Sequence, residues 1–478
     1  MKTSDETKSK AEPKAQESGF VSRDASLDRL VPEFPEHLPE LVAGEWKPFA
    51  VEGAHYLFHI PSSSLLEVPE DIHATVVKDP AAADSLPELV AIRSSLPAPK
   101  PRIFPKTPKI TAIALNVAET CNLRCVYCYA GDGNYGADTM MSKATGTAVI
   151  DFFAAQTERL HVVFFGGEPV LNFDLIREIV AWCQTKTGVT FSFSMTTNGT
   201  LLSREHMEFL KRHRFSLTIS YDGHGVHAAQ RLNKDRVSNS EELVERKLRS
   251  IEDQIRELDG FQLRGTILER NAALLEDAIT STLNDLPHAF MATLATQSSR
   301  YSVAKAAIDS AQAVTARVVE RYLAAREYDK IRRLKSLWGQ VSRIHRADRG
   351  SMTCGAGINY LSVSTKGEFY LCHRFTEDPR EKVGSLAKGL DLERLDRYRQ
   401  HRVTEHDPCK SCWMREMCAG GCFHDNRMTN GTSFRPDPKF CHTQDLLMQL
   451  AVRVYVRLRK EAPHILDGKP VNWRTENA

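Results

Sequence analysis

The sequence predicts an α/β protein built around a partial parallel (β/α)6 barrel. A small N-terminal α+β module precedes the barrel, and a cysteine-rich region follows it. Three observations predict this class: apolar runs alternate with amphipathic stretches from 110 to 300, polar motifs follow four successive runs, and seven of eleven cysteines lie between 354 and 441. Runs of consecutive apolar residues are typical of strands covered on both faces, and parallel strands need crossover connections.

The N-terminal part divides into a tail and a module. Residues 1–25 are rich in Lys, Glu and Ser, so we expect a disordered tail. Residues 26–100 form the module and its linker. Turn signals at Glu52-Gly53 and Pro61-Ser62 indicate two or three short strands, and a helix is predicted to begin at Pro69-Glu70. The Pro-rich stretch LPAPKPRIFPKTPK is predicted to connect this module to the barrel.

The barrel is assigned to residues 101–345. Its six predicted strands are ITAIALNV, HVVFF, FSFSM, FSLTIS, FQLRGTIL and AFMATLA, with helical stretches between them. Residues 301–345 are predicted to be helical throughout. Cys183 lies in one of the amphipathic helices, and we interpret it as a core residue.

Each of the first four strands is followed by a polar motif. CNLRCVYC follows the first, and FFGGEP (164–169), TTNG (196–199) and SYDG (220–223) follow the next three. Barrels of this kind carry functional groups on loops at the C-terminal ends of strands. Each short motif alone is more often an ordinary turn, but four in order favour one shared site. Cys121, Cys125 and Cys128 supply three thiolates, which predicts a metal centre with one position open.

CNLRCVYC followed by GGEP resembles the radical S-adenosylmethionine (radical SAM) superfamily, whose barrel is TIM-like. The resemblance implies that Cys121, Cys125 and Cys128 hold a [4Fe–4S] cluster and that S-adenosylmethionine binds its fourth iron. Gly166 and Gly167 would allow close backbone approach, and Glu168 would meet the ammonium of the cofactor. The remaining cofactor contacts implied are Tyr127 at the adenine, and Asn198, Ser220 and Asp222 near the carboxylate and ribose.

The region 346–478 carries the second group of cysteines. A turn containing Gly367 is predicted to bring Cys354 and Cys372 together in a hairpin. The spacing resembles the SPASM extension of radical SAM enzymes, which binds two auxiliary [4Fe–4S] clusters and would bring the total to three. The resemblance implies one set of Cys409, Cys412, Cys418 and Cys441, and a second set of Cys354, Cys372 and Cys422 that lacks a fourth cysteine. A zinc ribbon is the alternative, because CxxC pairs are typical zinc ligands.

Over most of its length the chain resembles the thioether-forming maturases, in particular those of quinohemoprotein amine dehydrogenase. This implies crosslinks from Cys sulfur to the methylene carbon of Asp or Glu in a small Cys-rich subunit, with flavodoxin or ferredoxin as electron donor. The module resembles winged-helix peptide-recognition elements, although a structural cap on the barrel explains it equally well. Asp235 is the candidate base, against the simpler interpretation of an exposed aspartate paired with Lys234 or Arg236.

Two other functions remain open at this point. A formylglycine-generating sulfatase maturase, or another enzyme that modifies ribosomal peptides, would use the same radical. Such sulfatase maturases have a further cysteine shortly after the first auxiliary one, where this chain has GAGINYLSV. The other alternative is a zinc-stabilised binding protein without enzymatic activity.

Composition limits the partners. Lys and Arg number 63 against 61 Asp and Glu, and no basic stripe is present, so we expect no nucleic-acid partner. The sequence has neither an apolar signal segment nor a run of membrane-spanning length, which predicts a soluble cytoplasmic protein. Clustered cysteines in a reducing compartment favour metal ligation over disulfides.

Overall fold

The structure is a computed structural model. It describes residues 42, 44–97, 107–136, 138–286, 290–294, 297–298, 301–302, 304–349 and 354–467. The tail predicted at 1–25 and most of the Pro-rich connector lie outside the described residues.

The N-terminal module is a three-stranded antiparallel sheet with two helices. Its elements are β1 (Trp46–Val51), β2 (Ala54–His59), β3 (Ser64–Glu67), α1 (Glu70–Lys78), η3 (Ala82–Ser85) and α2 (Pro87–Ser95). A small core around Trp46, Leu57 and Val76 joins the sheet to the helices. On the sheet's other side, the rings of Phe49 and Phe58 lie 5.4 and 5.7 Å from Trp413 of the C-terminal region. Both sides of this small sheet therefore have packing partners.

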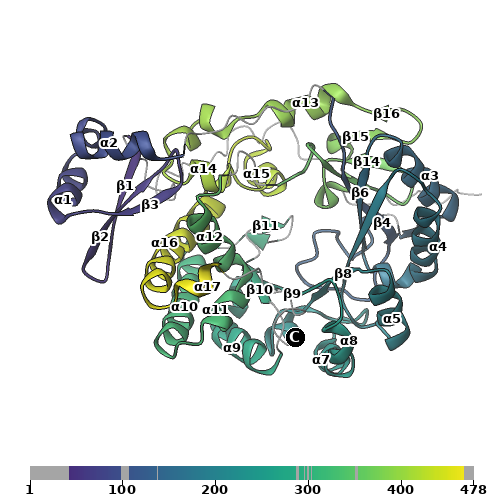
Figure 1. Cartoon of the computed structure of the whole chain (residues 1–478). Helices are drawn as coiled ribbons and strands as arrows, with labels where there is room; N and C mark the ends of the chain where they lie inside the picture. Colours follow the sequence, from purple (N-terminus) through teal and green to yellow (C-terminus); the bar gives the residue numbers. More distant parts are fainter. Residues whose placement is uncertain are drawn as a thin grey trace, which may run out of the picture. The chain divides into compact units, whose positions relative to one another are not determined.

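Six parallel strands form the barrel sheet, which confirms the predicted fold class (Figure 1). They are β4 (Ala112–Glu119), β6 (Arg159–Gly166), β7 (Thr190–Thr197), β8 (Ser216–Ser220), β9 (Gly260–Ile267) and β10 (Phe290–Leu294), adjacent in that order. The longer connecting helices are α3 (Lys143–Ala154), α4 (Phe173–Gln184), α5 (Arg204–Arg212), α7 (Glu241–Ser250) and α9 (Leu275–Asp285). Short elements between them are β5 (Thr139–Met140), η4 (Pro169–Asn172), α6 (Val226–Gln230), α8 (Glu252–Ile255) and η5 (Glu269–Leu274).

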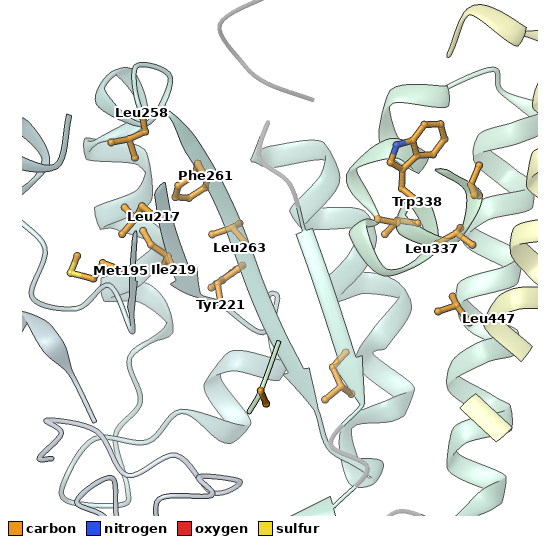
Figure 2. Close-up of a cluster of buried hydrophobic side chains, with 14 of the residues drawn as sticks. Met195, Leu217, Ile219, Tyr221, Leu258, Phe261, Leu263, Leu337, Trp338 and Leu447 are labelled. Atoms are coloured by element: carbon orange, nitrogen blue, oxygen red, sulfur yellow. The ribbon is translucent and has the colours of Figure 1, made fainter. Parts of the chain in front are cut away.

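Local sequence explains where several of these elements begin and pack. The Ser142 and Ser203 hydroxyls accept backbone N–H groups at the starts of α3 and α5, as N-cap residues do. Apolar side chains of neighbouring strands pack in one cluster, among them Ile219 of β8 with Phe261 and Leu263 of β9 (Figure 2).

Three helices follow the last barrel strand, as the helical pattern predicts, but residues 301–302 form a short strand, so the prediction of helix throughout 301–345 is wrong at its start. They are α10 (Lys305–Ala324), α11 (Tyr328–Arg333) and α12 (Lys335–Arg346), preceded by the short pair β11 (Gln297–Ser298) and β12 (Tyr301–Ser302). None of the described helices has both the length and the apolar composition that a membrane crossing requires.

The cysteine-rich region continues the barrel sheet. β13 (Tyr360–Val363) pairs in parallel with β4, and β14 (Glu368–Tyr370), β15 (Lys382–Ser385) and β16 (Gly389–Leu390) follow in antiparallel order. Gly367 has a φ of 76° in the predicted hairpin turn. The predicted division at residue 345 therefore does not coincide with an interruption of the sheet. The helical segments that follow are η6 (His373–Phe375), η7 (Pro379–Glu381), α13 (Leu392–Gln400), η8 (Val403–Glu405), η9 (Cys409–Ser411), α14 (Arg415–Cys418), α15 (Phe423–Asn430), α16 (Pro438–Glu461) and α17 (Pro463–Asp467).

Candidate active site

A cavity of about 430 Å³ lies at the C-terminal ends of the barrel strands. Its floor contains Cys121, Cys125 and Cys128, and the strand-end residues Gly166, Gly167, Thr197, Asn198, Ser220 and Thr266. The opposite wall comes from α10, α12 and α16, and His373, Arg374 and Asp425 line it from the cysteine-rich region. One cavity thus brings together the loops after β4, β6, β7 and β8, where the sequence motifs lie.

The glycines of GGEP allow the backbone to pass close to the cysteine loop. A Cβ on Gly167 would lie 2.3 Å from the carbonyl oxygens of both Thr120 and Gly133. Gly166 has a φ of +138°, and a Cβ there would lie 2.1 Å from the oxygen of Ala118. These contacts with backbone atoms leave no room for a side chain.

Glu168 is completely buried and does not line the cavity. Its carboxylate accepts the Thr197 hydroxyl at 2.7 Å, the Asn198 N–H at 2.7 Å and the Val170 N–H at 3.0 Å. Burial raises the pKa of this carboxyl, whereas those hydrogen bonds lower it. In the structure Glu168 joins the GGEP and TTNG loops, and its contact with the cofactor ammonium stays a prediction.

Asp222 is also completely buried and forms the centre of a hydrogen-bond network. Its carboxylate accepts the Tyr127 hydroxyl, the Thr266 N–H at 2.8 Å, and the Arg231 guanidinium at 3.0 and 3.1 Å. Arg231 in turn lies 4.0 Å from the Cys125 sulfur. Of the predicted cofactor contacts, Tyr127, Asn198 and Ser220 line the cavity, whereas Asp222 lies behind it.

The cysteines fall into three sets. Burial raises the pKa of Cys125 to about 12, and its nearest thiol neighbours are Cys128 and Cys121. Burial also raises the pKa of Cys372 to about 12, with Cys422 and Cys354 as its thiol neighbours. For the third set, burial and then Cys418, Cys409 and Cys412 raise the pKa of Cys441. Metal binding would have to remove these protons, since thiolates are the ligating form.

The three cysteine sets are compatible with iron–sulfur clusters. A zinc ion about 2.3 Å from each sulfur would hold the sulfurs about 3.8 Å apart. Among the described residues, His224, Glu241 and Glu245 are the only three ligand groups whose donor atoms lie within 4.8 Å of one another. No three cysteine sulfurs meet that distance in the described part of the chain, and sets of three and four thiolates also fit [4Fe–4S] clusters, in which each thiolate has its own iron.

Asp235 lies apart from the cavity. Its exposed carboxylate accepts the Ser238 hydroxyl at 2.6 Å and the N–H groups of Val237 and Ser238. The Ser238 hydroxyl and those N–H groups hold the pKa of Asp235 below its usual value. Arg236, its predicted ion-pair partner, instead meets Asp132 at 2.8 Å. Whether Asp235 acts as a base stays a prediction.

The structure adds residues that sequence reasoning missed. Arg231 and His373 line the cavity, and the ring of His373 lies 4.6 Å from that of Phe165. Burial and then the charge of Arg264 lower the pKa of His373 to about 3, so it is neutral. The one sequence signal for His373 is its position directly after Cys372. Arg231 and Arg264 lie in ordinary helical and strand patterns, which gave no signal.

Comparisons with known proteins agree with this site. Residues 115–257 match the family model described as the Radical SAM superfamily. The superfamily binds S-adenosylmethionine and a [4Fe–4S] cluster.

Individual relatives are more distant. The chain is 20% identical over 371 residues to the radical SAM cyclopropyl synthase TigE of Paramaledivibacter caminithermalis, covering 71% of this chain and 74% of TigE. A match of 34% over 112 residues to a protein of Methanocaldococcus jannaschii spans 23% of this chain and only 38% of that protein. The structure of native anSMEcpe with bound AdoMet and Cp18Cys peptide superposes with a TM-score of 0.60 at 16% identity, covering 73% of this chain and 98% of that one. This superposition covers more of the chain than residues 115–257, so the two proteins share their fold beyond the region that matches the family model.

Proposed function

We propose that this protein forms thioether crosslinks in a polypeptide, joining Cys sulfur to the methylene carbon of Asp or Glu. The proposed substrate is the small subunit of quinohemoprotein amine dehydrogenase, as the sequence resemblance implies. The observation that carries the proposal is the single cavity, which Cys121, Cys125 and Cys128 line on one side and the neighbours of Cys372 and Cys422 line on another. The proposed bond joins a sulfur and a carbon of one substrate. The residues at the radical cluster and those beside the C-terminal cysteines must therefore line the same cavity.

The donor sets fit the cofactors that the reaction needs. Cys121, Cys125 and Cys128 would hold the radical cluster, and the other two sets would hold two auxiliary clusters. When bound, the radical cluster and S-adenosylmethionine supply a 5′-deoxyadenosyl radical, and the set of three C-terminal cysteines leaves one iron free for a substrate thiolate. A flavodoxin or ferredoxin is the proposed electron donor.

The overall reaction balances without a further oxidant. One hydrogen atom leaves the methylene carbon for the 5′-deoxyadenosyl radical, and the thiol loses one proton. Forming the S–C bond releases one electron, which offsets the electron used to cleave S-adenosylmethionine. Each crosslink therefore lowers the substrate mass by two hydrogens.

Arg374 is placed to support the set of three C-terminal cysteines. Its guanidinium donates to the Cys422 sulfur at 3.6 Å and pairs with Asp425 at 2.7 Å. A cation beside a thiolate stabilises the charged form. This favours metal ligation at the wall of the cavity.

The N-terminal module is the proposed docking element for the polypeptide. Both sides of its sheet are covered, but the sheet order β1-β2-β3 leaves outer edges at β1 and β3 among the described residues. Extended peptides bind such edges as an added strand.

A Cys372→Ala variant tests the proposal because it separates making the radical from using it. With dithionite it should still form 5′-deoxyadenosine, yet give no product lighter by two hydrogens. Mass spectrometry of the small-subunit polypeptide and chromatography of 5′-deoxyadenosine measure both, in protein that retains iron at its other sites. Crosslinking at the parental rate would remove the auxiliary set from the mechanism.

A second candidate is a different radical modification of a peptide. The match to TigE over 371 residues favours this class, and the anSMEcpe structure contains a bound peptide. Formylglycine formation is the sulfatase-maturase version of this alternative. A product in which a Cys or Ser becomes an aldehyde, or a new carbon–carbon bond that leaves the thiol free, would replace the thioether assignment.

A further inference from the structure

The charge of the cavity wall is not balanced. Four cations and one carboxylate line the cavity: Arg231, Arg264, Lys335, Arg374 and Asp425. Arg231 is paired with the buried Asp222, and Arg374 is paired with Asp425. Within the described residues, the side chains of Arg264 and Lys335 have neither a hydrogen bond nor an ion pair. Two positive charges therefore face the cavity without a carboxylate of the protein.

Arg264 lies beside the proposed cofactor residues. It is paired in register with Ser220 across β8 and β9, and side chains of paired residues in a parallel sheet share one face. Leu263, the preceding residue, belongs to the buried cluster of Figure 2, so Arg264 points to the opposite face. Its charge also acts on His373 across the cavity.

Lys335 comes from the other wall. It lies in the first turn of α12, where the helix dipole disfavours a cation, and no acidic residue or side-chain cap is present there. Burial and then the charge of Arg332 lower the pKa of Lys335. A half-buried ammonium in this position is stabilised by an anion that enters the cavity.

We propose that Arg264 and Lys335 bind carboxylates of the substrate and thereby select acidic side chains. Arg264 holds the carboxylate of the reacting residue, since it is paired with Ser220 at the end of β8, and Lys335 binds the same acidic segment from the helical wall. A guanidinium can donate two parallel hydrogen bonds to a carboxylate, which would fix the direction of the adjacent methylene group. This inference rests on the proposed function for the identity of the substrate.

Binding measurements with paired substrates test the assignment. The probes are the dehydrogenase small-subunit polypeptide and the same polypeptide with Asn and Gln in place of its reacting Asp and Glu. Anaerobic fluorescence anisotropy with the reconstituted protein gives the acid-to-amide affinity ratio. The parent should prefer the acid roughly 10- to 100-fold, the range expected for a charge-assisted hydrogen bond.

The acid-to-amide affinity ratio should fall towards one in the Arg264→Gln variant and should decrease several-fold in the Lys335→Gln variant. Arg264→Lys keeps the charge but loses the two parallel donors of the guanidinium, so it should recover part of the acid-to-amide affinity ratio. Arg246→Gln is the matched control, because Arg246 is exposed on α7 and does not line the cavity. A parental ratio in Arg264→Gln overturns the assignment. So does weaker binding of S-adenosylmethionine with the ratio intact, which would place Arg264 at the cofactor.

A different result would reject the proposed thioether reaction without affecting the assignment of Arg264 and Lys335. A parent that prefers the acid but forms no thioether rejects the proposed reaction and leaves the cation pair standing. If the polypeptide does not bind the parent at all, N-acetyl-aspartate and N-acetyl-asparagine become the probes in saturation-transfer NMR. Equal signals from both in the parent, or unchanged preference for the acid in an Arg264→Gln/Lys335→Gln variant, then overturn the pair.

Discussion

The buried ion pair of Arg231 and Asp222 links the fourth strand loop to the first. Asp222 follows β8, Arg231 follows α6, and the guanidinium reaches the sulfur of Cys125 on the loop after β4. The side chain of Arg231 is 7% exposed and that of Asp222 is 0% exposed. A single residue therefore controls both the stability of this loop and the charge next to a proposed ligand.

Arg231→Gln should be strongly destabilising because it leaves the Asp222 carboxylate buried without its cation. Breaking such a pair typically costs about 3–5 kcal/mol. Urea unfolding of matched preparations measures the loss, and Asp222→Asn in the same chain should recover part of it. Arg204→Gln is the control, since its pair with Asp253 is exposed and its loss should leave the urea midpoint close to that of the parent.

The buried His227 should make the free energy of unfolding depend on pH. Burial and then the charge of Arg231 lower its pKa from 6.5 to about 3, while its ring nitrogens meet the Asp222 N–H and the Ser240 hydroxyl. The unfolded chain binds this proton below pH 6.5 and the folded protein does not. The free energy of unfolding should therefore fall by up to about 1.4 kcal/mol per pH unit on acidification below 6.5.

The comparison of His227→Gln with the parent isolates that slope. The variant should lose stability less steeply between pH 6.5 and about 5, as measured by urea unfolding at each pH. His224 has the opposite sign, because Glu245 and Glu241 raise its pKa and its contribution is lost as pH rises. An unchanged slope in His227→Gln would mean that His227 is protonated in the folded protein.

At the scale of elements, the six barrel strands could be predicted because each is a local apolar run. The pairing of β13 with β4 could not, since residues 360–363 and 112–115 are far apart in sequence and no local pattern records the pairing. The family resemblance implied three cysteine sets, and the thiols of each set are neighbours in the structure, while their role as ligands stays a prediction. The charged wall was missed, because Arg264 and Lys335 have meaning only where β9 and α12 face one cavity.

The close approach of the GGEP loop to the cysteine loop gives a prediction at this scale. Gly167→Ala should displace Thr120 and Gly133, because the new methyl group would lie 2.3 Å from two carbonyl oxygens. We expect a loss of about 1–3 kcal/mol, as for overpacked sites, and less iron retained per chain.

Gly188→Ala separates steric displacement from the loss of a glycine. Gly188 has a φ of +78° but open space around its Cβ position, so alanine there should cost about 1 kcal/mol from backbone strain alone. Iron content should then match the parent. Equal iron in the Gly167→Ala variant would show that the cysteine loop accommodates the methyl group.

For the whole molecule, the two C-terminal cysteine sets join segments that are separated in sequence. Cys354 and Cys372 come from the first part of the C-terminal region and Cys422 from near its middle, and Cys441 lies on the long helix α16 that also walls the cavity. Metal binding would therefore crosslink the C-terminal fold, as structural metal sites do in small domains.

Anaerobically purified protein should contain iron and acid-labile sulfide for three [4Fe–4S] clusters, measured by colorimetric iron and sulfide assays. The physical reason is that the sets offer three, three and four thiolates, the donors that hold [4Fe–4S] clusters. A variant with Cys121, Cys125 and Cys128 changed to Ala should lose about one third of its iron and all reductive cleavage of S-adenosylmethionine, because the other two sets remain. Cys183→Ala is the matched control, since this buried thiol belongs to the helical core and should leave the iron unchanged. Stoichiometric zinc with little iron would instead identify the C-terminal region as a zinc-stabilised fold and remove the auxiliary clusters from the proposed reaction.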